Sequence, residues 1–242
     1  MILMFEPKIT KMAHDNKNHE VFHAENLVVF DRNLLFLKDK KFAEVYKKTY
    51  EDSAEKNRFW RVHVFLWAFI NGLKLDGDLI ECGVYRGFSS AVATRYTDFG
   101  KINKTLYLFD TWEGIPQEQL DKNRIQSNLS KYEDPSNLKK VEERFKDLQN
   151  VKIVKGKVPD IFHETEMPEN VSFLHLDLNT SSGEIGALEF LFDKMVSGSV
   201  CLLDDYGHKI AAIQAVEEYG WFKRREYFIC ELPTGQAIIV KT

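Results

Sequence analysis

Short apolar runs alternate with amphipathic stretches from residue 78 to the end of the chain. We expect strands at residues 79–82, 106–109, 151–154, 171–176, 199–203, 226–232 and 237–241, and helices near residues 87–98, 136–147, 158–164, 183–196 and 209–219. This alternation is typical of an α/β fold with a mostly parallel sheet and helices on both faces. A short turn at residues 233–235 joins the last two strands, so we expect an antiparallel hairpin at the end of a seven-stranded sheet.

The N-terminal part has a different pattern. Apolar residues 27–30 and 34–37 flank a polar triplet, which is compatible with a hairpin or a docked arm. Helical spacing follows at about 40–50 and at 56–73, and the second stretch is apolar on more than one face, as in a helix buried in the core or against a second subunit. We therefore divide the chain into an arm with helices (1–74), serving packing, oligomer formation or a lid, and a main domain (75–242), and expect a homo-oligomer, a dimer or higher.

Composition excludes several classes of protein. The 242 residues are 44% hydrophobic, which suits one large domain, and the net charge of −4 argues against a general nucleic-acid binder. Cys82, Cys201 and Cys230 lie in apolar runs without metal-ligand spacing, so we expect buried, reduced thiols and a cytoplasmic location. No signal peptide is evident, and the longest apolar stretch is too short for a bilayer, so no membrane partner is expected.

A glycine turn at residues 77–90 organises the main domain. An apolar strand ends at Glu81, Gly83 and Gly87 follow, and a helix begins after them. Glycine allows a backbone to approach a ligand closely, but the spacing differs from the Gly-x-Gly-x-x-Gly of dinucleotide sites. From this turn alone, a ligand loop and a plain strand-to-helix connection are both possible.

Acidic residues follow several predicted strands. Ligands of open α/β sheets bind at the carboxyl ends of the strands, where Asp110 suits the two hydroxyls of a ribose and Gly156 allows close approach. Asp177, Asp204 and Asp205 converge there without an evident counter-ion, which favours a hard cation such as Mg²⁺. Helix caps and solvated charges are the alternative for these aspartates. The long polar segment 116–135 is either a surface loop or a lid over the site.

Five motifs, in order, resemble one family. They are Glu-Cys-Gly-Val-Tyr-Arg-Gly at 81–87, Phe-Asp-Thr-Trp-Glu-Gly-Ile-Pro at 109–116, Val-Lys-Gly-Lys-Val-Pro-Asp at 154–160, Leu-His-Leu-Asp-Leu-Asn at 174–179 and Leu-Asp-Asp-Tyr-Gly at 203–207. Over about 57–242 the chain is similar to the macrocin O-methyltransferase (TylF/MycF-type) family, S-adenosylmethionine-dependent enzymes with a class I Rossmann-like fold.

The resemblance implies roles for particular residues. The methionine part of S-adenosylmethionine would lie on Glu81, Gly83 and the turn through Ser89, which comprises Val84, Tyr85, Arg86 and Gly87. Asp110 would hold the ribose, with Thr111 and Trp112 beside the adenosine, Gly156 near the adenine, and Asp177 also at the cofactor. Asp177, Asp204 and Asp205 would bind Mg²⁺. Family members methylate a sugar hydroxyl of a glycosylated small molecule, so the expected partner is a small-molecule acceptor that contains a sugar.

One position departs from the family pattern. The family typically has Asp-x-Asp where this chain has Asp177-Leu178-Asn179, and an amide cannot act as the general base. His208 is the candidate replacement, with a water-facing residue at a helix start as the alternative, and His175 is interpreted as a core or supporting histidine. Together with Asp177 and Asn179, His208 completes the predicted catalytic set.

The sequence pattern allows four functions to be compared. The first is an Mg²⁺-dependent O-methyltransferase acting on a sugar or similar polyol. The second is an S-adenosylmethionine-binding protein whose chemistry is lost or altered because of Asn179. A phosphatase reading of Asp177-Leu178-Asn179-Thr180 is disfavoured because that motif normally opens a domain. The glycine spacing disfavours a dehydrogenase.

Overall fold

A computed structural model describes residues 10–14, 17–25, 27–121 and 129–242. Its main body is a seven-stranded sheet with the order β6-β5-β4-β7-β8-β10-β9. The strands are β4 (Asp78–Cys82), β5 (Leu106–Asp110), β6 (Val151–Lys155), β7 (Val171–Leu176), β8 (Met195–Leu203), β9 (Cys230–Glu231) and β10 (Ala237–Val240). The first five run parallel, and β10 is antiparallel to both β8 and β9. The predicted sheet and its terminal hairpin are confirmed.

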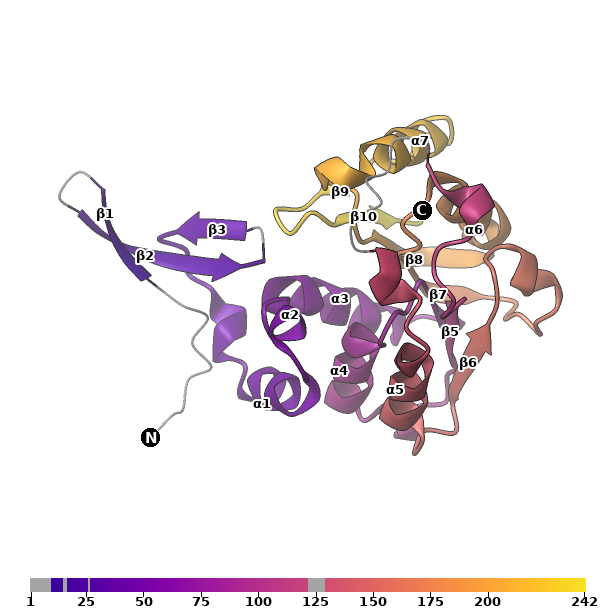
Figure 1. The fold of residues 1–242 in the computed structure, drawn as a ribbon, viewed down its shortest axis with the longest axis horizontal. Helices are drawn as coiled ribbons and strands as arrows, with labels where there is room; N and C mark the ends of the chain where they lie inside the picture. Colours follow the sequence, from indigo (N-terminus) through magenta and orange to yellow (C-terminus); the bar gives the residue numbers. More distant parts are fainter. Residues whose placement is uncertain (1–9, 15–16, 26, 122–128) are drawn as a thin grey trace.

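Helices cover both faces of this sheet (Figure 1). One face packs against α3 (Phe59–Gly72), α4 (Phe88–Thr97) and α5 (Ser136–Phe145), and the other against α6 (Ser181–Leu191) and α7 (Ala212–Lys223). Helix α1 (Lys40–Thr49) packs on α4 and shares the core of the first face. Alternate residues of β4 belong to the hydrophobic cores on the two sides of the sheet: Leu79 lies in the core under the first face and Ile80 in the core under the second. This period of two is what a sheet buried on both faces requires.

Helix α3 lies in the core, as its apolar faces predicted. Phe65 and Phe69 are buried in it and stack edge-on against Phe173 of β7. The short helix α2 (Ser53–Lys56) precedes it. None of the helices in the described ranges is long and apolar enough to cross a membrane.

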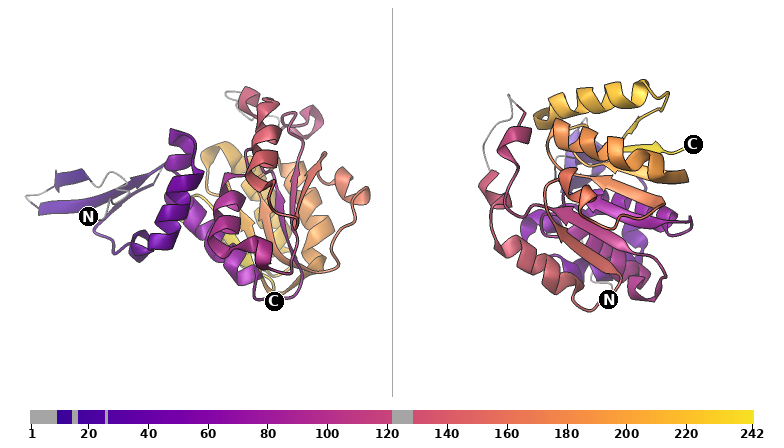
Figure 2. Two further views of the ribbon diagram at one scale, coloured as in Figure 1. Left: turned by 90° about the horizontal axis from the view of Figure 1, so that it is seen from below. Right: turned by 90° about the vertical axis from the view of Figure 1, so that its right-hand side faces the viewer.

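The N-terminal strands form a separate small sheet that projects from the main body (Figures 1 and 2). It has the order β1-β2-β3, with β1 (Thr10–His14), β2 (Lys17–Ala24) and β3 (Leu27–Phe30). Residues 27–30 pair with β2, whereas most of 34–37 belongs to the 3-10 helix Leu35–Lys38. The predicted alternative of a hairpin between residues 27–30 and 34–37 is therefore wrong. The division of the chain at residue 74 remains a prediction.

Three further expectations need correction. The predicted strand 226–232 shrinks to β9, because the backbone turns back on α7 through a hydrogen bond from the Tyr227 N–H to the Phe222 carbonyl (3.1 Å). Cys230 is exposed there on the edge of the sheet, while Cys82 and Cys201 are buried as expected. Residues 158–164 contain only the 3-10 helix Asp160–His163.

Candidate cofactor and metal site

The glycine turn lies where β4, β5 and β7 end. Gly83 has a φ of +86°, and a Cβ at this position would overlap the carbonyl oxygen of Asp177. Only glycine therefore fits between the two strand ends without a shift of the backbone. Its N–H donates to the Phe109 carbonyl (2.8 Å), which fixes the start of the turn on the neighbouring strand.

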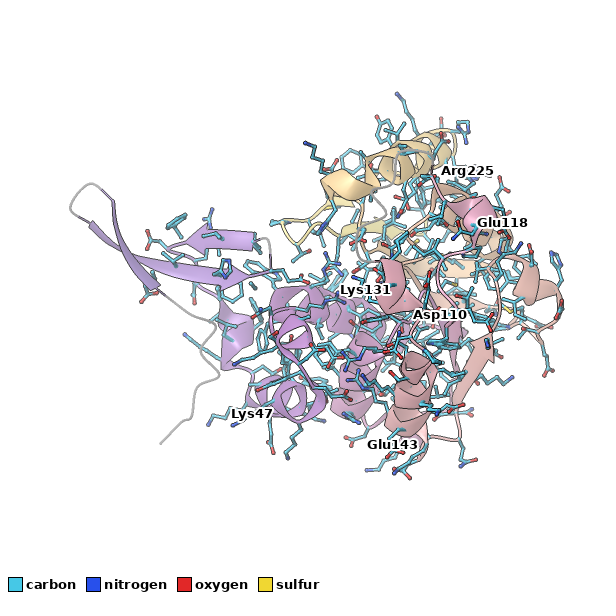
Figure 3. The ribbon with its side chains drawn as sticks, in the orientation of Figure 1. Lys47, Asp110, Glu118, Lys131, Glu143 and Arg225 are labelled. Atoms are coloured by element: carbon cyan, nitrogen blue, oxygen red, sulfur yellow. The ribbon has the colours of Figure 1, made fainter. Side chains whose placement is uncertain are left out.

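Asp110 holds this turn in shape. Its carboxylate accepts three backbone N–H groups, from Val84 (2.8 Å), Tyr85 (2.7 Å) and Trp112 (2.9 Å). Asp110 lies at the end of β5, inside the main body (Figure 3). A carboxylate has about four lone-pair positions, so about one remains for a ribose hydroxyl. The Trp112 indole is buried and donates to the Tyr85 carbonyl (2.8 Å), so this ring supports the turn from the core.

Two adjacent cavities follow the strand ends. One of about 50 Å³ brings together residues predicted for the adenosine end, namely Asp110, Thr111 and Gly156. The other, of about 80 Å³, is lined by residues predicted for the methionine end, among them Glu81, Val84 and Ser89. Gly83, Tyr85 and Asp177 line both cavities.

The described parts of segment 116–135 flank the first cavity. Pro116, Gln119 and Tyr132 line it, and the Gln119 amide donates to the Val158 carbonyl (2.8 Å). Glu118 and Lys131 mark the two described parts in Figure 3. Residues 122–128 lie outside the described residues, so the lid remains a prediction.

His175 connects the cofactor end to the carboxylates. It is buried in β7, with Nδ1 3.2 Å from Glu81 and Nε2 3.6 Å from Asp204. Burial opposes the charge on the ring, but Asp204 and Glu81 outweigh it and raise the pKa of His175 to about 10. The ring is therefore a cation between two carboxylates and supports them, as interpreted from the sequence. Glu81 also accepts a hydrogen bond from the hydroxyl of Ser90.

The structure brings the three predicted aspartates together. Asp177, after β7, and Asp204 and Asp205, after β8, each offer an oxygen within 4.8 Å of the others. Burial, followed by repulsion from Asp204 and Asp205, raises the pKa of Asp177 well above its usual range. Burial also opposes the charge of Asp204, but Arg61 and then His175 hold the pKa of Asp204 below its usual value.

Arg61 on α3 is the counter-ion that the sequence argument missed. Its Nη1 forms an ion pair with Asp204 and lies 3.3 Å from Asp205, and its Nε lies 3.2 Å from Glu25 in the turn between β2 and β3. The Arg61 side chain is only 7% exposed. The premise that the aspartates lack a protein cation is therefore wrong. The feature of the sequence that indicates this counter-ion is an arginine inside a largely apolar predicted helix.

His208, the candidate base, and Asn179, which stands at the position of the usual base, both make specific contacts. Arginine only donates hydrogen bonds, so the Arg61 Nη2 donates to Nε2 of His208 (2.7 Å). The Asn179 amide donates to Asp177 (2.9 Å), and Asn179 has a φ of +63°. The backbone N–H groups of Leu178 and Asn179 donate to Glu184 (3.0 and 3.3 Å), which fixes this loop on α6.

A family model described as macrocin O-methyltransferase (TylF) matches residues 56–226. The chain belongs to the macrocin O-methyltransferase family. It is accordingly an S-adenosylmethionine-dependent O-methyltransferase with the α/β fold predicted from its motifs. No curated protein matches the chain.

Solved structures share the fold of this macrocin O-methyltransferase family member. The O-methyltransferase NovP is similar with a TM-score of 0.59 and 20% identity, over 82% of this chain and 88% of NovP. The calicheamicin methyltransferase CalS11 also has a TM-score of 0.59, with 12% identity over 87% of this chain and 95% of CalS11. The S-adenosylhomocysteine-bound methyltransferase PaMTH1 of Podospora anserina has a TM-score of 0.55 and 12% identity, over 84% of this chain and 88% of PaMTH1.

Two residues of the glycine turn make contacts away from the strand ends. Arg86 pairs with Glu51 (2.7 Å) and Asp52, which ties the start of α2 to the turn. A Cβ at Gly87 would lie 3.0 Å from the Phe145 ring, so this glycine lets α5 pack against the turn. In this member of the macrocin O-methyltransferase family, Arg86 and Gly87 thus position the turn through contacts with other parts of the protein. Direct contact of Arg86 and Gly87 with the cofactor remains a prediction.

Proposed function

We propose that this protein transfers the methyl group of S-adenosylmethionine to a hydroxyl of a sugar or a glycosylated small molecule, with Mg²⁺ at Asp177, Asp204 and Asp205. The observation that carries the proposal is the place of these carboxylates beside two kinds of cavity. Asp177 and Asp204 line the 80 Å³ cavity along the glycine turn. Arg61, the ion-pair partner of Asp204 and Asp205, lines that cavity and also a cavity of about 260 Å³ that includes His208.

The 260 Å³ cavity suits a polyol. It is lined by Glu25, Asn57, Lys209 and the indole of Trp60. Carboxylate, amide and ammonium groups bond to hydroxyls, and an indole offers the apolar surface on which a sugar ring packs. A solved structure with 14% identity is described as a TDP-rhamnose 3'-O-methyltransferase, and its TM-score is 0.54 over 88% of this chain and 96% of that chain. We take a sugar as the acceptor class on the combination of these two observations.

The donor set fits Mg²⁺. Mg²⁺ takes carboxylate oxygens as ligands, and the three aspartates each offer an oxygen within 4.8 Å of the others. When bound, this metal lowers the pKa of a coordinated hydroxyl and makes it a better nucleophile. Asp177, Asp204 and Asp205 would hold it.

The other residues orient the reactants and control charge. Asp110 and Gly83 shape the turn on which the cofactor would lie, and protonated His175 stabilises the charge of Asp204. Asn179 does not accept a proton, so removal of the hydroxyl proton depends on the metal or on His208 once Arg61 no longer donates to it. Methyl transfer then requires in-line positioning of the hydroxyl and the sulfonium methyl.

The second candidate is a cofactor-binding protein with lost or altered chemistry. The hydrogen bond from the Asn179 amide to Asp177 favours it, because it occupies an oxygen of the predicted metal ligand. This candidate predicts cofactor binding without methyl transfer to any polyol.

Calorimetric titration with S-adenosylhomocysteine, with and without Mg²⁺, and methyl transfer from labelled S-adenosylmethionine to a panel of nucleotide sugars separate these candidates. We expect tight binding, transfer that depends on Mg²⁺, and loss of transfer in Asp204→Asn. The matched control is Asp160→Asn, a substitution of an exposed aspartate that pairs with Lys157 (2.7 Å). Absence of S-adenosylhomocysteine binding would contradict both candidates, and binding without any transfer would favour the second.

A further inference from the structure

The Arg61 guanidinium lies at the junction of the two kinds of cavity. It lines the 80 Å³ cavity together with Asp204 and the 260 Å³ cavity together with His208. Besides these contacts, its Nη2 donates to the Thr234 carbonyl (3.4 Å). The methyl donor and the acceptor in the proposed function would approach each other across this side chain.

Arg61 also occupies the oxygens that a metal would need. Its Nη1 contacts both Asp204 and Asp205, and the remaining oxygen of Asp204 accepts the Gln236 amide (2.9 Å). Both oxygens of Asp204 are thus engaged. A guanidinium and a divalent cation compete for these oxygens, because two cations a few ångströms apart in a buried site repel strongly.

Glu25 offers Arg61 a second position. Its carboxylate lies 3.2 Å from Arg61 Nε and 3.2 Å from Arg58 Nε, and it borders the 260 Å³ cavity. A guanidinium that swings away from Asp204 towards this cavity keeps its ion pair with Glu25. The charge of Arg61 therefore stays paired after it leaves the aspartates, which lowers the cost of the movement.

We infer that Arg61 is a built-in competitor of the metal: its guanidinium holds the cation position on Asp204 and Asp205, and Mg²⁺ binds by displacing it towards Glu25. This inference rests on the metal site of the proposed function. Displacement of Arg61 also frees Nε2 of His208 and removes the side chain that lies between the two cavities. Metal binding and access of the acceptor to the methyl donor are thereby coupled through one residue.

The test is calorimetric titration of the whole protein with MgCl₂ alone. Arg61→Gln removes the competitor, and we expect it to bind Mg²⁺ at least about tenfold more tightly than the wild type, the size expected for removal of a close charge contact. Arg58→Gln is the matched control, because it removes one positive charge from the same segment and the same partner, Glu25. We expect it to change the affinity by less than about threefold.

Two results would overturn the inference. Equal or weaker Mg²⁺ binding by Arg61→Gln would mean that Arg61 does not compete with the metal. An equal gain in Mg²⁺ affinity in Arg58→Gln would mean that the loss of any positive charge from this segment strengthens Mg²⁺ binding, without displacement of a particular side chain. Failure of the inference differs from failure of the metal site: in the former, Mg²⁺ still binds the wild type and binding is lost in Asp204→Asn, whereas in the latter neither the wild type nor Arg61→Gln binds Mg²⁺.

A second measurement tests the inference if Arg61→Gln is too unstable for calorimetry. Without Arg61, Asp204 is buried with one cation fewer, and Mg²⁺ would replace it. We therefore expect added Mg²⁺ to raise the melting temperature of Arg61→Gln by more than that of the wild type or of Arg61→Lys, which keeps the charge. An equal rise in all three proteins would contradict competition.

Discussion

The charge on His175 has a measurable effect on stability, and His175→Gln is the substitution that reveals it. Glutamine keeps a polar side chain in the strand but cannot become a cation. In the folded protein, Glu81 and Asp204 raise the pKa of His175 from 6.5 to about 10 against the effect of burial. A group with a raised folded pKa stabilises the protein fully below its unfolded pKa, and this stabilisation is lost as the pH rises through the folded pKa.

The size of the effect follows from the shift. A change from 6.5 to about 10 corresponds to about 5 kcal/mol of stabilisation at low pH. At pH about 7 about 4 kcal/mol of it remains, and at pH about 9.5 about 1 kcal/mol. We therefore expect the free energy of unfolding of the wild type, relative to His175→Gln, to fall by about 3 kcal/mol between these two pH values.

The assay is urea unfolding of both proteins at the two pH values, followed by circular dichroism. Using the difference between the proteins removes the contributions of thiols and tyrosines that titrate in the same range. His163→Gln serves as the control, because His163 is exposed on the 3-10 helix Asp160–His163. A difference between wild type and His175→Gln that does not change with pH would refute the assignment of His175 as a cation.

Three further predictions concern the turn. Gly83→Ala should destabilise the protein by about 3 kcal/mol or more and abolish S-adenosylhomocysteine binding, because its Cβ would overlap the Asp177 carbonyl. Thermal unfolding measures the stability and calorimetry measures the binding. Gly198→Ala is the milder comparison, because Gly198 has a similar φ of +84° but more space around its Cα. Asp110→Asn should cost about 1–3 kcal/mol, since an amide oxygen cannot serve all three N–H groups, and an unchanged urea midpoint would show that these bonds do not hold the turn. Trp112→Phe should lose about 1 kcal/mol with its indole hydrogen bond, measured in the same way.

The convergence of the aspartates was predictable because it follows from topology. Asp177 and Asp204 come directly after apolar strands, and parallel neighbours end at the same edge of a sheet. The period of apolar residues identifies such strands without knowledge of their partners. The edge strand was predicted less well: 226–232 has the composition of a strand, but its first residues hydrogen-bond to the end of α7.

The sequence by itself determined the α/β fold, the order of the strand-end motifs and the family to which they belong. Tertiary structure alone decided the charge balance of the site, since Arg61 meets Asp204 across 143 positions of sequence and pairs with Glu25 from the turn between β2 and β3 of the small N-terminal sheet. The physical reason is that periodicity reports which side of an element is buried, whereas the partner of a buried charge depends on which elements pack together. Asn179 could be read as a lost base from the motif, but its bond to Asp177 and the cationic state of His175 emerge only when the strands lie side by side.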